Sequence, residues 1–266
     1  MPYLIAHPAA VVPLRPHLGR LGVLSALVIG SIAPDLWYFA PSLVSRAETH
    51  SATALLWFCL PVGMAIYTAY QVFFRHPLLG LLPRALSCRL ATTDGFAPVS
   101  WLAVTVSILV GSATHFVWDA FTHGKGVAVQ ALPILRIQLA AIGSYELYVY
   151  TLLQHGSTFL GVSLLAWWIA RWWRSSATTL SQPPLLLSPA QRIWVFGFLV
   201  AASIAAAALS AAAADWKVMD GAALRVVLRQ SAFAGLTGFL LGLSLYSLLW
   251  HFVFRSRDHR WAPWSR

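Results

Sequence analysis

The sequence has few charged residues and only two cysteines. Charged side chains make up 10% of its 266 residues, and only eight of them are acidic. Together with 59% apolar residues and a mean hydropathy of +0.70, this excludes an ordinary soluble domain. Cys59 and Cys88 lack CxxC spacing, so they support neither a disulfide framework nor a zinc–thiolate site. The composition therefore predicts a polytopic membrane protein.

A basic stripe with interleaved aromatic residues is also missing, although the net charge is +10. The Lys and Arg residues stand at the ends of apolar runs, where they act as membrane-orientation signals. Several of the 13 Trp residues lie near the ends of the same runs, as in an interfacial aromatic belt. We therefore expect the lipid bilayer, and no nucleic acid, as the partner.

Long apolar runs predict the architecture. A helix needs about 20 mostly apolar residues to cross a membrane, and four runs reach that length: 52–74, 99–121, 193–214 and 231–254. A fifth run, 157–173, is slightly short and is expected to extend backward through 145–154. Residues 8–14 and 20–33 predict an N-terminal helical hairpin, and 131–144 an interfacial helix. The expected fold is all-α, a polytopic helical membrane protein with about five spanning helices.

A Ser/Pro-rich segment at 176–192 predicts a linker between two parts of the chain. Residues 1–175 contain all the candidate site residues and are expected to form a helical membrane domain. Residues 193–266 are expected to add an accessory pair of transmembrane helices with a basic tail.

The distribution of arginines predicts the orientation. Arginines concentrate in the loop 75–98, in the loop 171–192 and in the C-terminal tail, which an alternating path places on one side. The positive-inside rule makes that side cytoplasmic, so the C-terminus is expected there. The start of span 52–74 and the end of span 99–121 are then expected near the outer face.

His and Asp residues at the ends of apolar runs carry the candidate chemistry. Within Thr-His-Phe-Val-Trp-Asp-Ala-Phe-Thr-His-Gly, His115 and Asp119 share one helix face at four-residue spacing. Ionisable side chains at membrane depth are costly and are usually functional. Imidazole combined with carboxylate suits Zn, Mn or Fe. The further candidates, most of them beside turn or proline residues, are His7, Asp35, His50, His123 and His155.

Each candidate also has a purely structural interpretation. His115 and Asp119 could form a hydrogen-bonded pair inside a helix bundle. His50 lies between a Thr and a Ser that could N-cap span 52–74, and Asp35 could N-cap the residues that follow it. His123 would lie about 12 Å from His115 along a continuous helix. It could therefore serve a second ion or the substrate, or cap the helix.

These motifs resemble a family of uncharacterised bacterial membrane proteins, the domain-of-unknown-function family 4184. The resemblance covers roughly residues 1–175 and rests on His7-Pro8-Ala9-Ala10, Gly30-Ser31-Ile32-Ala33-Pro34-Asp35, Thr49-His50-Ser51, Thr114-His115 through Trp118-Asp119-Ala120-Phe121-Thr122-His123, and Gln154-His155-Gly156-Ser157. A broader likeness is to the YdjM-like inner-membrane proteins, predicted metal-dependent hydrolases. That group is distantly similar to the helical zinc phospholipase C and P1-nuclease proteins.

The resemblance implies a metal site in a protein of the bacterial inner membrane, formed by His7, Asp35, His50, His115 and Asp119. The complete ligand set of the soluble zinc enzymes has no counterpart in this sequence. The resemblance therefore implies a metal site more strongly than it implies any particular reaction.

The expected function is metal-dependent hydrolysis of a phosphoester in a lipid or lipid-linked substrate near the outer leaflet. The expected roles are core ligands of Zn or Mn for His50, His115 and Asp119, further ligands for His7 and Asp35, and substrate contact or proton shuttle for His123 or His155. The alternative is a non-catalytic membrane protein with a structural metal site or a buried His/Asp network. A transporter is disfavoured, because it needs ionisable groups across the membrane and spans 193–214 and 231–254 contain none inside.

Overall fold

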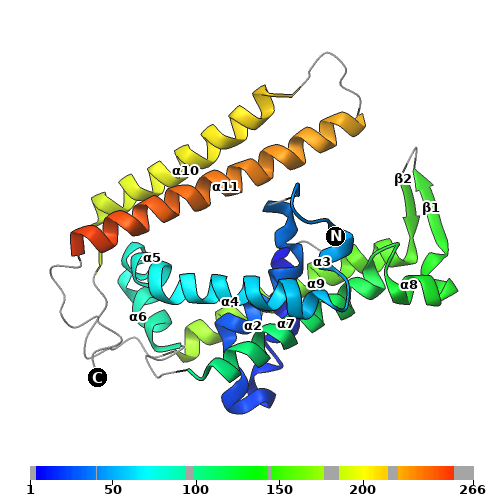
Figure 1. Cartoon of the computed structure of the whole chain (residues 1–266), viewed down its shortest axis with the longest axis horizontal. Coiled ribbons are helices and arrows are strands. Elements are labelled where there is room, and N and C mark those ends of the chain that lie inside the picture. The colour runs from blue at the N-terminus through cyan, green and yellow to red at the C-terminus, as the bar shows by residue number, and fades with distance from the viewer. Residues whose placement is uncertain are drawn as a thin grey trace. The chain divides into compact units, whose positions relative to one another are not determined.

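The computed structural model is built mainly of helices, with one two-stranded sheet among the residues that it describes (Figure 1), so the expected all-α class is confirmed. The structure describes residues 4–39, 41–93, 99–142, 145–176, 186–214 and 221–254. The chain divides into two compact units, Met1–Thr68 with Thr92–Ala177, and Ala69–Ala91 with Thr178–Arg266. Most of the predicted linker, at 177–185, and the basic tail, at 255–266, lie outside the described residues.

The first unit carries the candidate site residues. Its elements are η1 (Leu4–Ala6), α1 (Pro8–Val11), η2 (Arg15–Leu21), α2 (Leu24–Ile32), η3 (Ala33–Phe39), α3 (Arg46–Thr49), η4 (Leu55–Cys59), most of α4 (Leu60–Ala69), α7 (Trp101–Thr122), α8 (Val127–Ala131), η6 (Pro133–Arg136), β1 (Gln138–Ile142), β2 (Tyr145–Tyr148) and α9 (Val149–Ser175). The elements of the second unit are η5 (Tyr70–Phe74), α5 (Arg75–Leu81), most of α6 (Arg84–Thr93), α10 (Pro189–Ala212) and α11 (Gly221–Phe254).

Among the described residues, four helices are long and apolar enough to cross a membrane: Leu55–Leu81, Trp101–Ala131, Pro189–Ala212 and Ala223–Phe254. Each contains most of one of the four predicted apolar runs. A fifth crossing results if the bent pair Arg15–Leu21 and Leu24–Phe39, which turns by 112°, counts as one span. The predicted N-terminal hairpin takes this form, although its first arm begins at Arg15 and not at residue 8.

The region between α7 and α9 differs from the prediction. The predicted interfacial helix at 131–144 is wrong, because this region forms η6 and β1 instead. Pro133 has no backbone N–H and cannot continue α8, and the residues after η6 pair with β2 in an antiparallel ladder that joins Gln138 to Tyr148. Helix α9 is long, as expected, but it begins at Val149 and is not among the four candidate spans.

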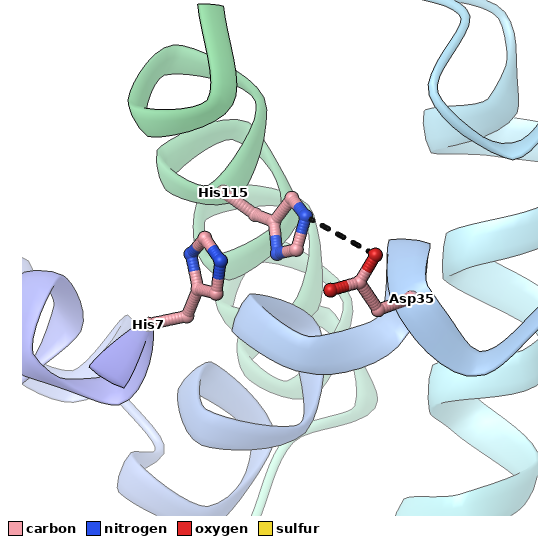
Figure 2. A group of neighbouring side chains, drawn as sticks. All are labelled: His7, Asp35 and His115. Atoms are coloured by element: carbon pink, nitrogen blue, oxygen red, sulfur yellow. Dashed lines mark ion pairs between the residues drawn. The ribbon is translucent and has the colours of Figure 1, made fainter. Parts of the chain in front are cut away.

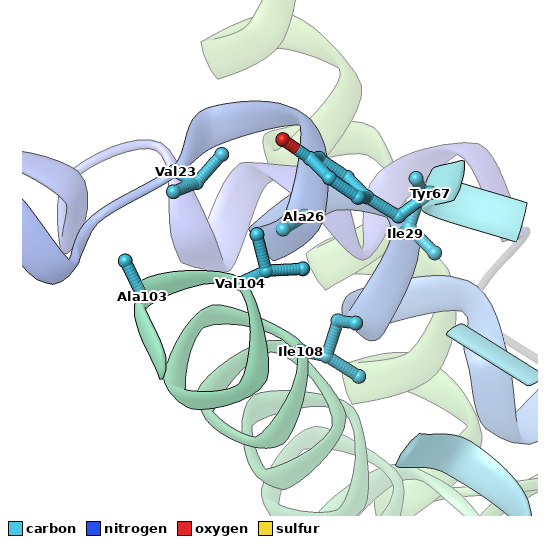
Figure 3. Close-up of a cluster of buried hydrophobic side chains, with 7 residues drawn as sticks. All are labelled: Val23, Ala26, Ile29, Tyr67, Ala103, Val104 and Ile108. Carbon is cyan, nitrogen blue, oxygen red and sulfur yellow. The ribbon is translucent and has the colours of Figure 1, made fainter. Parts of the chain in front are cut away.

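Helices α2 and α7 pack closely and form the core beneath the site. Ala26 and Ile29 of α2, with Val23 at its N-cap, meet Ala103, Val104 and Ile108 of α7, and Tyr67 completes this cluster (Figure 3). Glycines allow the close approach. A Cβ atom on Gly30 would collide with the backbone of Ile108, and one on Gly111 would collide with the backbone of Leu27. Helix α2, which leads directly into the η3 segment that carries Asp35, is thereby held against the helix that carries His115.

In the second unit, α10 and α11 pack along small residues. Gly238 lies against Ala202 and Ala206, and Gly235 lies against Ser203 and Ala207. Side chains of α11 also contact α5, where the Tyr246 hydroxyl donates to the backbone carbonyl of Pro77 at 3.0 Å. Neither group of metal-ligand-type side chains found in the described residues involves this unit.

Candidate metal centre

Helix α7 presents one buried face that changes from apolar to polar along its length. Val104, Ile108 and Gly111 are buried toward its start, and His115 and Asp119 continue the same face toward its end. The His115 side chain is fully buried and that of Asp119 is 8% exposed. The four-residue spacing predicted that they share a face, and His115 Nε2 lies 3.5 Å from Asp119 Oδ2.

Three other segments bring ligand-type side chains to this point. His7 caps the start of α1, Asp35 lies within η3, and His50 follows α3. His50 Nε2 lies 3.3 Å from Asp35 Oδ1 and 3.5 Å from Asp119 Oδ2. His115 Nε2 lies 3.9 Å from Asp35 Oδ1, which approaches it from the side opposite His7 (Figure 2). We call these five side chains, including His115 and Asp119, the His/Asp cluster.

The hydrogen bonds of His50 and His115 aim their free nitrogens into the cluster. His115 Nδ1 lies 2.8 Å from the carbonyl oxygen of Ser31, and His50 Nδ1 lies 3.1 Å from that of Arg46. Because a carbonyl only accepts, Nδ1 carries the proton in both rings and Nε2 of the neutral ring holds a lone pair. Both Nε2 atoms are buried without a hydrogen-bond partner. Such backbone bonds are typical of histidines that bind metal.

The facing atoms of His50, His115 and the two carboxylates are acceptors. Within the described part of the chain, the Oδ1 atoms of Asp35 and Asp119 are buried without a hydrogen-bond partner, as are both ring nitrogens of His7, one of which is an acceptor in the neutral ring. Buried acceptors facing one another are unfavourable unless a proton or a cation lies between them. Two occupants meet this need: protons on the Nε2 atoms, or a divalent ion.

The spacing of the cluster fits an ion. Two ligand atoms bound about 2.05 Å from one tetrahedral ion lie about 3.4 Å apart, close to the 3.3 and 3.5 Å separations around His50 and Asp119. Two three-residue groups suit a metal, His50 with His115 and Asp119, and His7 with Asp35 and His115. His115 belongs to both but has only one free nitrogen. The two groups could therefore not each hold an ion through His115 at the same time.

His7 is a neutral member of the cluster. Its ring stacks on that of His115, with centroids 3.9 Å apart, and its Nε2 lies 3.8 Å from Asp119 Oδ1. Burial, followed by the nearby His115, lowers the pKa of His7 to about 3. The neutral imidazole is the form that ligates a metal. The ring of Trp118 makes an edge-to-face contact with His7, with ring centroids 5.5 Å apart.

His123 and His155 have different positions. Helix α7 ends at Thr122, and His123 takes an extended backbone that brings its Nδ1 3.3 Å from Asp119 Oδ1. His123 follows Asp119 by four residues and lies beside its carboxylate, just beyond the end of the helix. His155 lies exposed on α9 and belongs to neither ligand group. The catalytic roles of these two residues stay predictions.

The caps predicted around His50 are different from those observed. Helix α3 begins after Ser45, whose hydroxyl and Glu48 form a reciprocal capping box, and His50 is the C-cap of that helix. Neither Thr49 nor Ser51 caps the following span, because their hydroxyls donate to carbonyls of α3. Asp35, which could have been an N-cap, is instead buried within η3.

Sequence reasoning missed Arg46. Its Nη2 donates to Asp119 Oδ2 at 2.7 Å, so a guanidinium touches a candidate metal ligand. Two signals were available in the sequence. Ser45 and Glu48 have the spacing of a capping box, and Arg46 stands four residues before His50, one helical turn away.

An apolar groove of about 690 Å³ lies beside the cluster in the same unit. It is lined by residues of α7, including Val117 and Trp118, with Ala10 of α1 and Leu153 of α9. The Trp118 indole N–H donates to the Ser157 hydroxyl at 2.9 Å and ties α7 to α9. Because Trp118 also packs against His7, one side chain borders both the groove and the cluster.

Comparisons with known proteins identify one family. No curated protein and no solved structure matches the chain. The family described as a domain of unknown function, DUF4184, has a model that matches residues 1–248. The match includes the whole cluster and extends beyond residue 175, where the sequence resemblance ended. The chain therefore belongs to the DUF4184 family.

Proposed function

We propose that this protein is a metal-dependent hydrolase of the membrane that cleaves a phosphoester in a lipid or lipid-linked substrate. The observation that carries the proposal is the convergence of buried, unpartnered nitrogen and oxygen acceptors in the His/Asp cluster. His50, His115 and Asp119 are the core ligands, and Asp35 and His7 complete the set. Zinc is the expected ion, with manganese as the second choice.

The arrangement supplies the parts that hydrolysis needs. A divalent ion in such a site polarises a phosphoryl oxygen and lowers the pKa of a bound water to about 7. The backbone carbonyls of Ser31 and Arg46 hold the imidazoles of His115 and His50 in the ligating orientation. His123, at 3.3 Å from Asp119 Oδ1, is placed to accept or return a proton at the edge of the cluster.

The groove beside Trp118 supports a lipid substrate. It opens along α7, which belongs to a candidate membrane span, and its lining is almost wholly apolar. A hydrocarbon chain that lies in this groove gains the free energy of burial without leaving the bilayer. The polar end of that molecule then lies beside His7 and the rest of the His/Asp cluster. The arginine-rich loops predict that this site lies near the outer leaflet of the bacterial inner membrane, with the C-terminus cytoplasmic.

A structural role for the same cluster is the second candidate function. The near-complete burial of His115 and Asp119 favours it, because closed metal sites have four protein ligands and Asp35 is placed to be the fourth. A structural ion would stabilise the fold without turnover. Unfolding on chelation would therefore indicate a structural ion, and loss of hydrolysis in a folded protein would indicate a catalytic one.

The decisive experiment measures bound metal and hydrolysis together. The full chain is purified in detergent, its zinc and manganese are quantified by mass spectrometry, and a panel of phosphoesters is screened. His115→Ala and Asp119→Ala should lose metal and hydrolysis while they still insert into the membrane. His17→Ala, an exposed histidine of η2 outside both ligand groups, is the matched control and should retain both. Wild-type hydrolysis rates in the His115 and Asp119 variants would refute the proposal.

A further inference from the structure

Arg46 places a positive charge where a metal site would ordinarily exclude one. Its guanidinium donates to Asp119 Oδ2 at 2.7 Å, and the same oxygen lies 3.5 Å from the Nε2 atoms of His50 and His115. A cation bound between these atoms is repelled by a guanidinium at such a short distance. The arginine therefore weakens cation binding unless it also has an anion to contact.

The guanidinium has unused donors and access to solvent. Of its five N–H groups, a single bond, to Asp119, is found within the described part of the chain. The side chain is 31% exposed, whereas those of Asp119 and His115 are 8% and 0% exposed. Arg46 thus lies on the accessible side of the cluster, with donors left over for an incoming ligand.

The local fold holds Arg46 firmly in this position. It is the first residue of α3, which the Ser45 and Glu48 capping box closes at its start. Its backbone carbonyl accepts the Nδ1–H of His50, so the residue orients one candidate ligand through its backbone while its side chain reaches another. The backbone of Arg46 is therefore anchored in α3, and its guanidinium lies against Asp119.

We propose that Arg46 is the anion-binding residue of this site and contacts a phosphoryl oxygen of the substrate directly. The inference rests on the metal site of the proposed function. Two carboxylates, one divalent ion and one arginine leave the cluster with a net charge of about +1 when its histidines are neutral, which suits a phosphate ester. Arginine is the side chain best suited to such an anion, since its planar fork donates two parallel hydrogen bonds.

The alternative role for Arg46 is to orient Asp119 as a ligand without touching the substrate. The two roles predict different responses. An orienting residue changes metal binding when it is replaced, and phosphate binding follows only as a consequence. An anion-binding residue changes phosphate binding at constant metal content.

The test uses inorganic phosphate as the probe. The detergent-purified full chain is loaded with zinc, and phosphate binding is measured by titration calorimetry for the wild type, Arg46→Gln and Arg46→Lys. Arg20→Gln removes the same charge from an exposed arginine of η2 and is the control. We expect equal zinc content in all four proteins, phosphate affinity weakened about tenfold or more in Arg46→Gln, partial recovery in Arg46→Lys, and no change in Arg20→Gln.

The outcomes separate this inference from the proposed function. Unchanged phosphate affinity in Arg46→Gln would overturn the inference while the metal site stands. Loss of zinc from that variant, with phosphate binding restored at saturating zinc, would assign Arg46 the orienting role and also overturn it. If the wild type binds no metal, the proposed function fails. Phosphate binding that still depends on Arg46 would then support the anion site by itself, and its absence would overturn it.

Discussion

The imidazole of His115 donates its Nδ1–H to the backbone carbonyl of Ser31 at 2.8 Å, across the interface between α7 and α2. Ser112 reinforces the same interface, since its hydroxyl donates to the carbonyl of Gly30 at 3.0 Å. The orientation of the His115 ring in α7 is therefore determined by the position of α2. The close packing of these two apolar helices places an imidazole that is a ligand in the proposed metal site.

This dependence predicts that a methyl group between the helices impairs the metal site without altering any ligand. In Gly111→Ala the new Cβ would meet the backbone of Leu27 and Ser31, which cannot rotate away. We expect a loss of stability of about 1–3 kcal/mol, as for overpacked cores, and a reduced metal content. Thermal unfolding in detergent and metal analysis by mass spectrometry measure the two effects.

The control for this change is Gly197→Ala in α10, where a Cβ atom would meet nothing within 4 Å. Alanine favours a helix over glycine by up to about 1 kcal/mol, so this variant should be as stable as the wild type or more so. Equal behaviour of the two variants would show that the α2–α7 interface does not control the site.

The contribution of His50 to the stability of the metal-free protein should fall as the pH rises. Burial lowers the pKa of His50, but the carboxylates of Asp119 and Asp35 outweigh burial and raise it above its ordinary value of 6.5. A raised pKa contributes stability that is complete below the unfolded-state pKa and is lost as the pH rises through the folded-state pKa. With a chelator present, the difference in unfolding temperature between the wild type and His50→Gln should narrow from about pH 5 to about pH 9.

Added zinc should give the opposite trend, because a proton on His50 Nε2 competes with the ion and binding improves as the pH rises. A stability difference that stays constant or widens with pH in the chelated protein would contradict the raised pKa of His50. His17→Ala again serves as the control, since His17 is exposed on η2.

Filling the apolar groove should slow the hydrolysis of lipid substrates and leave the hydrolysis of small, water-soluble ones nearly unchanged. Val117→Trp places a large ring in the groove, which Val117 lines, and leaves every candidate ligand in place. We expect at least a tenfold lower kcat/KM for a long-chain phosphoester, equivalent to the loss of about 1.4 kcal/mol of binding, and little change for a water-soluble one. Leu160→Trp adds the same ring to an exposed position of α9 that does not line the groove, and it should behave as the wild type. Equal losses for both substrates would argue against the groove as the lipid site.

Labelling of single cysteines tests the predicted orientation. In a background without Cys59 and Cys88, a cysteine in place of the exposed Ser42, close to the cluster in sequence, should react with an impermeant thiol reagent on intact spheroplasts. A cysteine at Ser265 in the basic tail should react only after permeabilisation, because the positive-inside rule places the tail in the cytoplasm. The reverse pattern would invert the topology and move the site to the cytoplasmic leaflet.

Periodicity and length were sufficient to predict much of the fold. The four longest apolar runs form helices, and the four-residue spacing of His115 and Asp119 places them on one face, because both features depend only on the geometry of a single helix. Helix boundaries and the region between α7 and α9 were less predictable. The strand pair at Gln138–Ile142 and Tyr145–Tyr148 depends on hydrogen bonds between two segments, and an apolar run of that length has no pattern that excludes a helix.

The candidate site was also predictable in part from the sequence and in part only from the tertiary structure. The sequence by itself determined that His and Asp residues would stand at the ends of apolar helices, because charged groups are unfavourable within a bilayer and their positions are visible in the chain. Only the tertiary structure decided that His7, Asp35 and His50 meet Asp119 and His115, that Arg46 joins them, and that His155 lies on an exposed part of α9. The positions of these side chains depend on long-range packing contacts, such as that of Gly111 with α2. Such contacts join residues about 80 positions apart in the chain, so they leave no periodic pattern in the sequence.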